Sequence, residues 1–562
     1  MDKVRTLTLD DFNQTIDEAK VTEINIMSSD KIKLNQTLIV IETNKTTVEL
    51  GSPSDGVVSK IHVNVGDSIT QNTDLCSIET YNILEDVIEI ANKNSESIET
   101  DLVIVGAGPA GYTAAFRAAD LGIKTVLIDK YPELGGTCLN SGCIPSKFLL
   151  HIVSGVHNAQ HLSDYGVKYD EPYVDLRKMM QAKDNVINTL NMGLKSLKTK
   201  RNIKFIQGKA KFLDVNTLSI NTGEHNQKVK FSKAIIATGS VPRKIPTLDI
   251  EDSRIKYSEQ ALNIQYIPER MLVVGGGVIG LELASVYHGL GSKVSIIEAS
   301  DTILGMFDND MVDPLLTKYE NCFESVLTNT VIDNVNVSSS ILTVKLKQKS
   351  SYITEKYDSI LVATGRVPNT HGLNLDAIHL NTDEFGFISV SRNYETSIDN
   401  IYAIGDVIGN PMLAHKGSYE GRIVAEVCAG ARHGDDSNEP LLPFVVYTEP
   451  EIAWVGMTEK QKNDDIEVVK TSWSANGRAL TQDSSYGLTK LLVNKHSGVI
   501  VGGGMVGPNV GEMLTELTLL IQRKITVQEL AAIIHPHPTI SETIGMCAEI
   551  YLKEAIEVIN TV

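Results

Sequence analysis

Two glycine-rich segments limit the possible folds of this chain more than any other feature. The first, DLVIVGAGPAGYTAAFRAADLGIKTVLIDK, starts at Asp101 and runs from an apolar strand into an alanine-rich helix and a second strand. Three glycines open that helix: Gly106, Gly108 and Gly111. Glycines at this spacing permit a tight turn, the approach of backbone to a pyrophosphate and close packing of the helix on the strand. This segment predicts a βαβ unit that binds a dinucleotide.

The second segment, MLVVGGGVIGLELASVYHGLGSKVSIIEAS, starts at Met271 and repeats the arrangement with Gly275, Gly277 and Gly280. In each segment an acid, Asp129 or Glu298, follows the first glycine by 23 residues. An acid at this place can accept a hydrogen bond from a ribose hydroxyl. No Arg or Lys stands in the ASDTILG that follows Glu298, so we expect NAD rather than NADP at the second site.

Length and charge restrict the classes of partner. A chain of 562 residues is long enough for several domains, and a net charge of −19 opposes binding to nucleic acid or to an anionic membrane. The N-terminus, MDKVRTLTLDDFNQTIDEAK, lacks the apolar stretch of a signal peptide and carries acids that transit peptides avoid. No apolar run approaches the ~20 residues of a membrane helix. We therefore expect a cytoplasmic protein with no membrane span and no nucleic-acid partner.

An internal repeat organises the N-terminus. Residues 24–44 and 61–81 share a pattern at an offset of 37, with matched pairs such as Ile24/Ile61 and Asp30/Asp67. Alternating apolar positions indicate short β-strands. The repeat predicts a small all-β domain over residues 1–82, with Lys45 at the tip of a hairpin between the halves. Residues 83–100 are acidic and polar, and we expect them to form a linker.

Cys138 and Cys143 lie in GGTCLNSGCIPSK, directly after the first βαβ unit. Six cysteines are too few for a secreted disulfide framework, so a close pair favours redox or metal chemistry. On a regular helix the pair would be separated by roughly 7.5 Å of axial rise, outside disulfide range. A bond between them requires a distorted backbone, which Gly142 and Pro145 make plausible. No second Cys/His pair has zinc spacing, and we expect no metal site.

The whole of residues 101–562 resembles the pyridine nucleotide-disulfide oxidoreductases, and among them the dihydrolipoyl dehydrogenases. The resemblance rests on the cysteine motif, both glycine segments, ATG at 237–239 and 363–365, AIGD at 403–406 and HPHPTISE at 535–542. It implies an α/β fold with two Rossmann-like domains and an α+β dimerisation domain. The implied limits are an FAD-binding domain at 101–245, an NAD-binding domain at 246–370, a central segment at 371–440 that completes the FAD site, and a dimer-interface domain at 441–562.

The resemblance also assigns catalytic roles. Cys138 is the sulfur that exchanges with substrate, Cys143 contacts the flavin, and His537 is a base oriented by Glu542. Thr539-x-x-Glu542 is also a capping-box pattern, which would give Glu542 a purely structural role. His535 is left out because it stands beside a proline and the base of the family is the second histidine. Further implied cofactor contacts are Lys147 with its partner Glu282, and Ala210, Thr238, Gly239, Val331, Gly365, Asp406 and Ala414.

The implied activity is oxidation of dihydrolipoyl groups, with electrons passing through the cysteine pair and FAD to NAD. Such an enzyme is a homodimer and serves the lipoyl domains and core of 2-oxo acid dehydrogenase complexes. Two alternatives remain: another disulfide reductase of the same family, or a carrier or docking protein whose oxidoreductase part is vestigial. The sequence argues against the first alternative. Glutathione reductases need basic residues after the position of Glu298 and mercuric reductases need a C-terminal cysteine pair, and neither feature is present.

The N-terminal domain resembles lipoyl domains in VIETNKTTVELGSPSDGVVSKIHVNVGD, and Lys45 matches their modified lysine. Asn44 replaces the acid that usually precedes this lysine, and Ser29 replaces a glycine of the first half. A biotinyl domain is disfavoured because its Met-Lys-Met context is absent. We expect a lipoyl group on Lys45.

Overall fold

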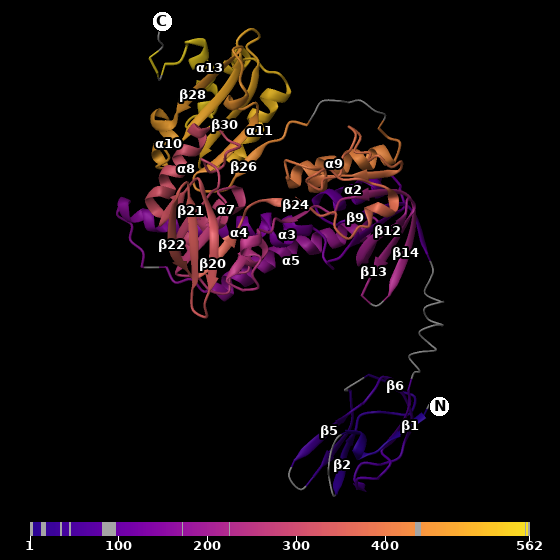
Figure 1. Cartoon of the computed structure of the whole chain (residues 1–562). Coiled ribbons are helices and arrows are strands. Elements are labelled where there is room, and N and C mark those ends of the chain that lie inside the picture. Colours follow the sequence, from indigo (N-terminus) through magenta and orange to yellow (C-terminus); the bar gives the residue numbers. More distant parts are fainter. Residues whose placement is uncertain are drawn as a thin grey trace. The chain divides into compact units, whose positions relative to one another are not determined.

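The computed structural model describes residues 4–12, 18–33, 36–43, 46–80, 97–170, 172–223, 225–432, 440–556 and 558–559. The chain divides into two compact units, Met1–Ser97 and Ile98–Val562, which Figure 1 draws along the sequence from indigo to yellow. Residues 83–96, most of the predicted linker 83–100, lie outside the described residues. The predicted class, an α/β protein preceded by a small all-β domain, is confirmed.

The first unit consists of two four-stranded sheets, ordered β1-β8-β6-β3 and β5-β4-β2-β7. Its strands are β1 (Val4–Leu7), β2 (Ala19–Ile24), β3 (Lys31–Ile32), β4 (Thr37–Glu42), β5 (Thr47–Gly51), β6 (Gly56–Ile61), β7 (Ser68–Ile69) and β8 (Cys76–Thr80). A shift of 37 residues moves β2 and β3 onto β6 and β7. Each half lends a strand to the other half's sheet, because β3 pairs with β6 and β7 pairs with β2. The two halves therefore share one core.

Ser29 and Gly66 occupy equivalent turns of the repeat. Both have positive φ, 78° and 101°, and their N–H groups donate to Val58 O and Val21 O respectively. The left-handed region favours glycine, which explains why a glycine is usual at this turn. Ser29 adopts the same conformation at some conformational cost.

The β4–β5 hairpin is closed by a hydrogen bond from Thr43 N to Thr46 O of 2.9 Å, and Glu42 lies opposite Thr47. Asn44 and Lys45, predicted at the tip of this hairpin, lie outside the described residues.

The first Rossmann-like sheet of the second unit has the order β11-β10-β9-β14-β13-β12, and β25 pairs with β14. Strand β9 begins at Ile98, three residues earlier than expected, because residues 98–100 extend its parallel pairing with β14. Helices α2 and α9 pack side by side on this sheet (Figure 1). The elements are β9 (Ile98–Val105), α2 (Pro109–Asp120), β10 (Thr125–Asp129), α3 (Gly136–Ser141), α4 (Cys143–His161), α5 (Leu176–Lys200), β11 (Lys204–Gln207), β12 (Lys209–Asp214), β13 (Thr217–Asn221), β14 (Asn226–Ile236), β25 (Ile401–Ala403) and α9 (Ala414–Cys428).

The second Rossmann-like sheet is parallel, with the order β16-β23-β17-β18-β19. A three-stranded antiparallel sheet, β20-β21-β22, is inserted in the chain between β19 and β23, and a short β15–β24 pair joins residues 240–242 to 366–368. The elements are β15 (Ser240–Pro242), β16 (Ile255–Tyr257), α6 (Ser258–Ala261), β17 (Arg270–Val274), α7 (Val278–Gly289), β18 (Lys293–Ile297), α8 (Asn309–Cys322), β19 (Ser325–Leu327), β20 (Thr330–Val337), β21 (Leu342–Gln348), β22 (Ser351–Tyr357), β23 (Ser359–Val362) and β24 (Arg366–Pro368).

The C-terminal part is an antiparallel sheet, β26-β27-β30-β29-β28, covered by helices. The elements are β26 (Phe444–Val446), β27 (Glu451–Gly456), η6 (Glu459–Gln461), β28 (Ile466–Ser472), α10 (Gly477–Thr481), β29 (Leu488–Asn494), β30 (Ile500–Gly507), α11 (Val510–Gln522), α12 (Val527–Ala531) and α13 (Glu542–Leu552). Among the described residues, no helix combines the length and apolar character that crossing a bilayer requires.

Candidate redox and dinucleotide site

One cavity of about 2360 Å³ in the second unit joins the two glycine turns to the cysteine motif. The helix α2 follows the first turn and α7 follows the second, so the amino ends of both helices face this space. A helix amino end favours an anion such as a pyrophosphate.

The three glycines of the first turn each meet a different requirement. Gly106 has a φ of +108°, and a Cβ atom there would lie 2.1 Å from Ala237 O. Gly111 packs so closely that a Cβ would lie 1.8 Å from Gly106 O. Gly108 lines the cavity, and a Cβ there would meet nothing nearer than 3.9 Å. Its backbone is therefore open to a bound group.

The second turn repeats these positions. Gly275 has a φ of +112°, and a Cβ on Gly280 would lie 2.1 Å from Gly275 O. Gly277 lines the cavity, and no atom lies within 4 Å of a Cβ built there. Thr238 and Thr364, which follow the strands beside the two turns, each have a buried hydroxyl with no hydrogen-bond partner. Open glycine backbone and unpaired hydroxyls at equivalent places fit two dinucleotides.

The acids of the two units, Asp129 and Glu298, line the cavity and hold the glycine turns. Asp129 accepts hydrogen bonds from Ala107 N at 2.6 Å and Tyr131 N at 3.0 Å. Glu298 accepts from Gly276 N at 2.7 Å and Ser300 N at 2.8 Å. The sequence pattern predicted a contact of each acid with a ribose hydroxyl, but it did not reveal that each carboxylate also holds the backbone of its glycine turn.

The cysteine motif is interrupted between its two sulfurs. Helix α3 ends at Ser141, Gly142 takes φ −142° and ψ −107°, and α4 begins at Cys143. A Cβ on Gly142 would lie 2.9 Å from Thr137 O, so a side chain would not fit there without a shift. Cys138 and Cys143 both line the cavity and are free thiols in this structure. The backbone distortion expected at Gly142 is present.

The two thiols differ electrostatically. A hydrogen bond from Cys138 is the largest effect on Cys143 and, with the Lys147 ammonium, lowers the Cys143 pKa to about 7 against the opposing effect of burial. The pKa of Cys138 is raised, first by its hydrogen bond to Cys143 and then by burial. Cys143 is therefore the thiol that ionises near neutral pH, while Cys138 keeps its proton.

Lys147, one turn after Cys143, forms an ion pair with Glu282 at 2.7 Å. Glu282 is 3% exposed and also accepts a hydrogen bond from Tyr447 N at 3.2 Å. The Lys147 ammonium lies 4.7 Å from the centroid of the Tyr447 ring. This set joins the cysteine-bearing helix to α7 and to the C-terminal sheet, and it places a cation beside the cysteine pair.

The remaining predicted cofactor contacts also line the cavity: Ala210, Thr238, Gly239, Val331, Gly365, Asp406 and Ala414. Asp406 accepts a hydrogen bond from Ser240 Oγ at 2.6 Å, and Arg366 Nε donates to the same hydroxyl at 2.7 Å. Burial lowers the pKa of Arg366. Sequence reasoning missed Ser240 and Arg366, although each stands next to an ATG motif.

His537 and Glu542 form a pair outside the cavity of their own chain. His537 Nδ1 lies 2.7 Å from Glu542 Oε1, and Glu542 Oε2 accepts a hydrogen bond from Thr539 N at 2.7 Å. The His537 side chain is 78% exposed, and neither residue lines the cavity. Helix α13 begins at Glu542 and its N-cap is Ser541, although the bond from Thr539 N to Glu542 is the one that the capping-box pattern predicts. His535 is mostly buried and pairs with Glu516 at 2.8 Å.

The sequence matches known families over most of its length. Residues 100–421 match the family described as pyridine nucleotide-disulphide oxidoreductase, and residues 442–548 match the dimerisation domain of that family. Residues 6–78 match the family described as biotin-requiring enzyme, whose model covers biotin and lipoyl domains.

Two curated relatives carry the name dihydrolipoyl dehydrogenase. The protein of Buchnera aphidicola subsp. Acyrthosiphon pisum is 44% identical over 83% of this chain and 99% of its own length. The protein of Vibrio cholerae is 42% identical over 81% of this chain and 96% of its own length. Among solved structures, the HOCl-induced flavoprotein disulfide reductase of Escherichia coli is similar, with a TM-score of 0.71 and 27% identity over 80% of this chain and 99% of its own.

Proposed function

The chain belongs to the pyridine nucleotide-disulphide oxidoreductase family, and from this premise we propose that it is a dihydrolipoyl dehydrogenase that uses FAD and NAD. The observation that carries the proposal is the single cavity in which a low-pKa cysteine lies between two dinucleotide turns. The names of the two curated relatives support the proposal, since dihydrolipoyl dehydrogenase activity needs a cysteine pair and two dinucleotide sites. The domain limits predicted from the sequence belong to the same proposal.

The cysteine pair accepts electrons from the substrate when it is bridged. One thiolate of the dihydrolipoyl group attacks Cys138 Sγ, and Cys143 leaves as a thiolate that the nearby Lys147 ammonium stabilises. The second substrate thiolate then displaces Cys138, so that lipoyl disulfide departs and both cysteines are reduced. His537 Nε2 takes the proton of the first attacking thiol and releases it to solvent. It then takes the proton of the second thiol and returns it to the Cys138 sulfur as that sulfur leaves. Nε2 is the acting nitrogen because Nδ1 is bonded to Glu542.

The residues of the first turn, with Lys147, Asp406 and Ala414, would hold FAD, and those of the second turn would hold NAD. When bound, the two groups supply two-electron transfer from the cysteine pair to the nicotinamide. The Glu298 carboxylate, with no basic residue near it in the sequence, favours a free ribose hydroxyl over a 2′-phosphate.

The proposed assembly is a homodimer in which His537 of one subunit completes the cysteine site of the other. The exposure of a base outside its own chain's cavity and the match to a dimerisation domain support this arrangement. The proposed partners are the lipoyl domains and core of 2-oxo acid dehydrogenase complexes, and the proposed location is the cytoplasm.

The first unit is proposed to carry a lipoyl group on Lys45. The support is its match to the family of biotin and lipoyl domains, together with the hairpin that Thr43 and Thr46 close around residues 44 and 45. A dithiolane on a tethered unit would raise its effective concentration at Cys138. Mass spectrometry of the Lys45 peptide from lipoate-fed cells tests this: a lipoyl adduct supports it, whereas a biotinyl adduct or an unmodified lysine contradicts it.

The proposed activity is tested by NADH formation from free dihydrolipoamide and NAD, followed by assays with the lipoyl domain of each 2-oxo acid complex. Reduction of glutathione disulfide by NADPH serves as the competing assay. Turnover in the first and none in the second is the expected result. The reverse result would favour a different disulfide reductase of the family.

A further inference from the structure

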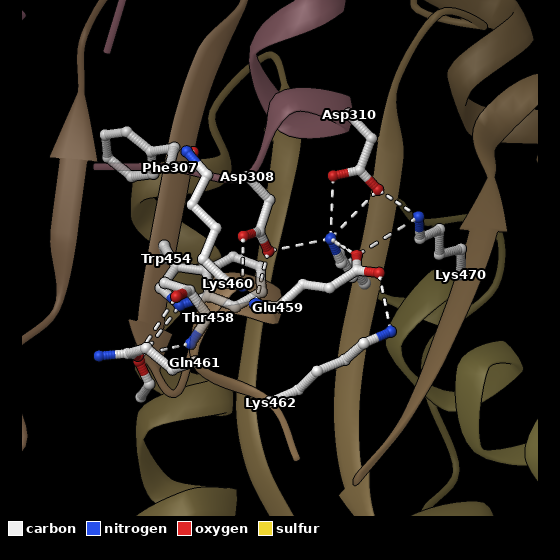
Figure 2. Close-up of polar contacts among 12 residues, drawn as sticks. Phe307, Asp308, Asp310, Trp454, Thr458, Glu459, Lys460, Gln461, Lys462 and Lys470 are labelled. Carbon is white, nitrogen blue, oxygen red and sulfur yellow. Dashed lines mark hydrogen bonds and ion pairs between the residues drawn. The ribbon is translucent and has the colours of Figure 1, made fainter. Parts of the chain in front are cut away.

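A buried lysine lies at the boundary between the second Rossmann-like sheet region and the C-terminal sheet. Lys490, on β29, is 0% exposed. Its Nζ lies 2.9 Å from Asp308 Oδ2, 2.9 Å from Asp310 Oδ1 and 2.6 Å from Glu459 Oε2. Figure 2 shows these three carboxylates with Lys460, Lys462 and Lys470 around them. The acids alone would resemble a cation site, but an ammonium already occupies the space among them.

The charges come from two parts of the chain. Asp308 and Asp310 stand at the start of α8, whereas Glu459 and Lys490 belong to the C-terminal sheet region. Asp308 is the N-cap residue of α8, but its side chain makes no capping hydrogen bond to that helix. Its carboxylate instead accepts from Glu459 N at 3.0 Å. An N-cap side chain usually bonds the first turn of its own helix, whereas the Asp308 side chain joins the two parts of the chain.

The segment just before α8, residues 303–308, is held at both of its ends; we call it the nucleotide loop. At the C-terminal end, Lys460 Nζ donates to Gly305 O at 2.9 Å and to Phe307 O at 2.6 Å. At the other end, Leu304 N donates to Gly276 O at 2.9 Å, inside the second glycine turn. Ile303 packs against that turn, since a Cβ on Gly276 would lie 2.7 Å from the Ile303 side chain.

The nucleotide loop also forms part of the cavity wall. Met306 and Phe307 line the cavity together with Gly277 and Glu298. Met306 is 55% exposed and Leu304 has a φ of +48°, an uncommon conformation for leucine. A loop with such a backbone keeps its shape only where its surroundings hold it. Here the surroundings are the glycine turn on one side and the Lys490 network on the other.

We propose that Asp308, Lys460 and Lys490 are positioning residues for the nicotinamide nucleotide: they fix the nucleotide loop against the second glycine turn, so that the C-terminal sheet region sets the affinity for NAD. None of the three lines the cavity. They act through Met306, Phe307 and the Gly276 peptide. The inference rests on the proposed function only in taking the second site as the NAD site.

The test is calorimetric titration of NAD into the oxidised, flavin-loaded, full-length protein, because NADH would reduce the flavin during the titration. Lys460→Met removes only an exposed ammonium and its two bonds to the loop, so its fold is expected to persist. Asp308→Asn is a second variant, which weakens the contact to Lys490 while Asp310 and Glu459 still pair with that lysine. Lys462→Met is the matched control, because Lys462 pairs with Glu459 at 3.2 Å but donates nothing to the loop.

Lys460→Met and Asp308→Asn are each expected to raise the Kd for NAD about three- to tenfold, whereas Lys462→Met stays within about twofold of wild type. Flavin content, and kcat with dihydrolipoamide at saturating NAD, are expected to stay unchanged. Wild-type Kd values in both loop variants, with intact flavin content and thermal unfolding, would overturn the inference. So would a wild type that binds no NAD. If the Kd shifts appear but the wild type does not oxidise dihydrolipoamide, the inference holds and the proposed function fails.

Discussion

Glu542 uses its two carboxylate oxygens for two different partners: Oε1 lies 2.7 Å from His537 Nδ1, and Oε2 accepts the N–H of Thr539 at 2.7 Å. Burial pushes the pKa of Glu542 upward, but the Thr539 N–H and His537 outweigh it and lower the pKa overall. An ionised Glu542 fixes the imidazole so that Nε2 is the free nitrogen.

The first prediction concerns this pair. Glu542→Ala is expected to lower kcat/KM for dihydrolipoamide by roughly 100-fold, because His537 loses its orientation, and Glu542→Gln by roughly tenfold, because an amide oxygen can still accept from Nδ1. Electron transfer from NADH to a small artificial acceptor needs no thiol deprotonation and serves as the control. Equal losses in both assays would show that Glu542 only maintains the fold.

The second prediction concerns the exposed position of His537. If it acts on the partner's cysteines, mixing inactive Cys138→Ser and His537→Ala subunits restores activity in the heterodimer, since one of its two sites is then intact. Differently tagged subunits, purified in tandem, establish that the heterodimer has formed. Heterodimers with no activity would mean that the base acts elsewhere.

The third prediction concerns nucleotide choice. Glu298→Ala is expected to lower the ratio of kcat/KM for NAD to that for NADP by about tenfold or more, because the repulsive carboxylate is gone. The variant also loses the clamp on Gly276 N and Ser300 N, so activity with NAD falls as well. For this reason the ratio is the informative quantity. A ratio equal to that of wild type would place the ribose away from Glu298.

The fourth prediction follows from the pKa of Cys143, which is lowered to about 7 by the Cys138 hydrogen bond first and by Lys147. The thiolate forms as pH rises through this value, so alkylation of Cys143 in reduced protein should increase with a midpoint near it. Cys138→Ser keeps a hydroxyl donor and should retain a low midpoint. Cys138→Ala removes the donor while burial remains, and should raise the midpoint by about one unit. Equal midpoints in the two variants would contradict the assigned cause.

The local parts of the site were predictable from the sequence because short spacing encodes them. Gly106, Gly108 and Gly111 lie within six residues, and the structure gives each the geometry that the pattern requires. The internal repeat likewise predicted the all-β unit. The cysteine roles and the role of His537 depended on resemblance, because the short spacing of Cys138 with Cys143 and of His537 with Glu542 does not show which sulfur meets the substrate or which residue acts as the base.

Contacts between distant segments could not be predicted in the same way. Ser240 and Asp406 are separated by 166 residues, and Lys490 and Asp308 by 182. Before the fold is known, Lys490 is one lysine in a strand-like stretch, and only packing makes it the fully buried centre of three carboxylates. Helix α13 begins at Glu542, two residues later than an N-cap at Thr539 would place it, although the bond from Thr539 N to Glu542 fits the Thr-x-x-Glu pattern.

The central claim is that substrate electrons pass through the Cys138–Cys143 pair while the dinucleotide sites are built without the sulfurs. Its most direct test is Cys143→Ser in the assay of NADH formation from dihydrolipoamide, with flavin content measured on the same sample. We predict that turnover is abolished and flavin is fully retained, because the glycine-turn and Asp406 contacts do not involve Sγ. Turnover that persists, or flavin that is lost with the thiol, would contradict the account.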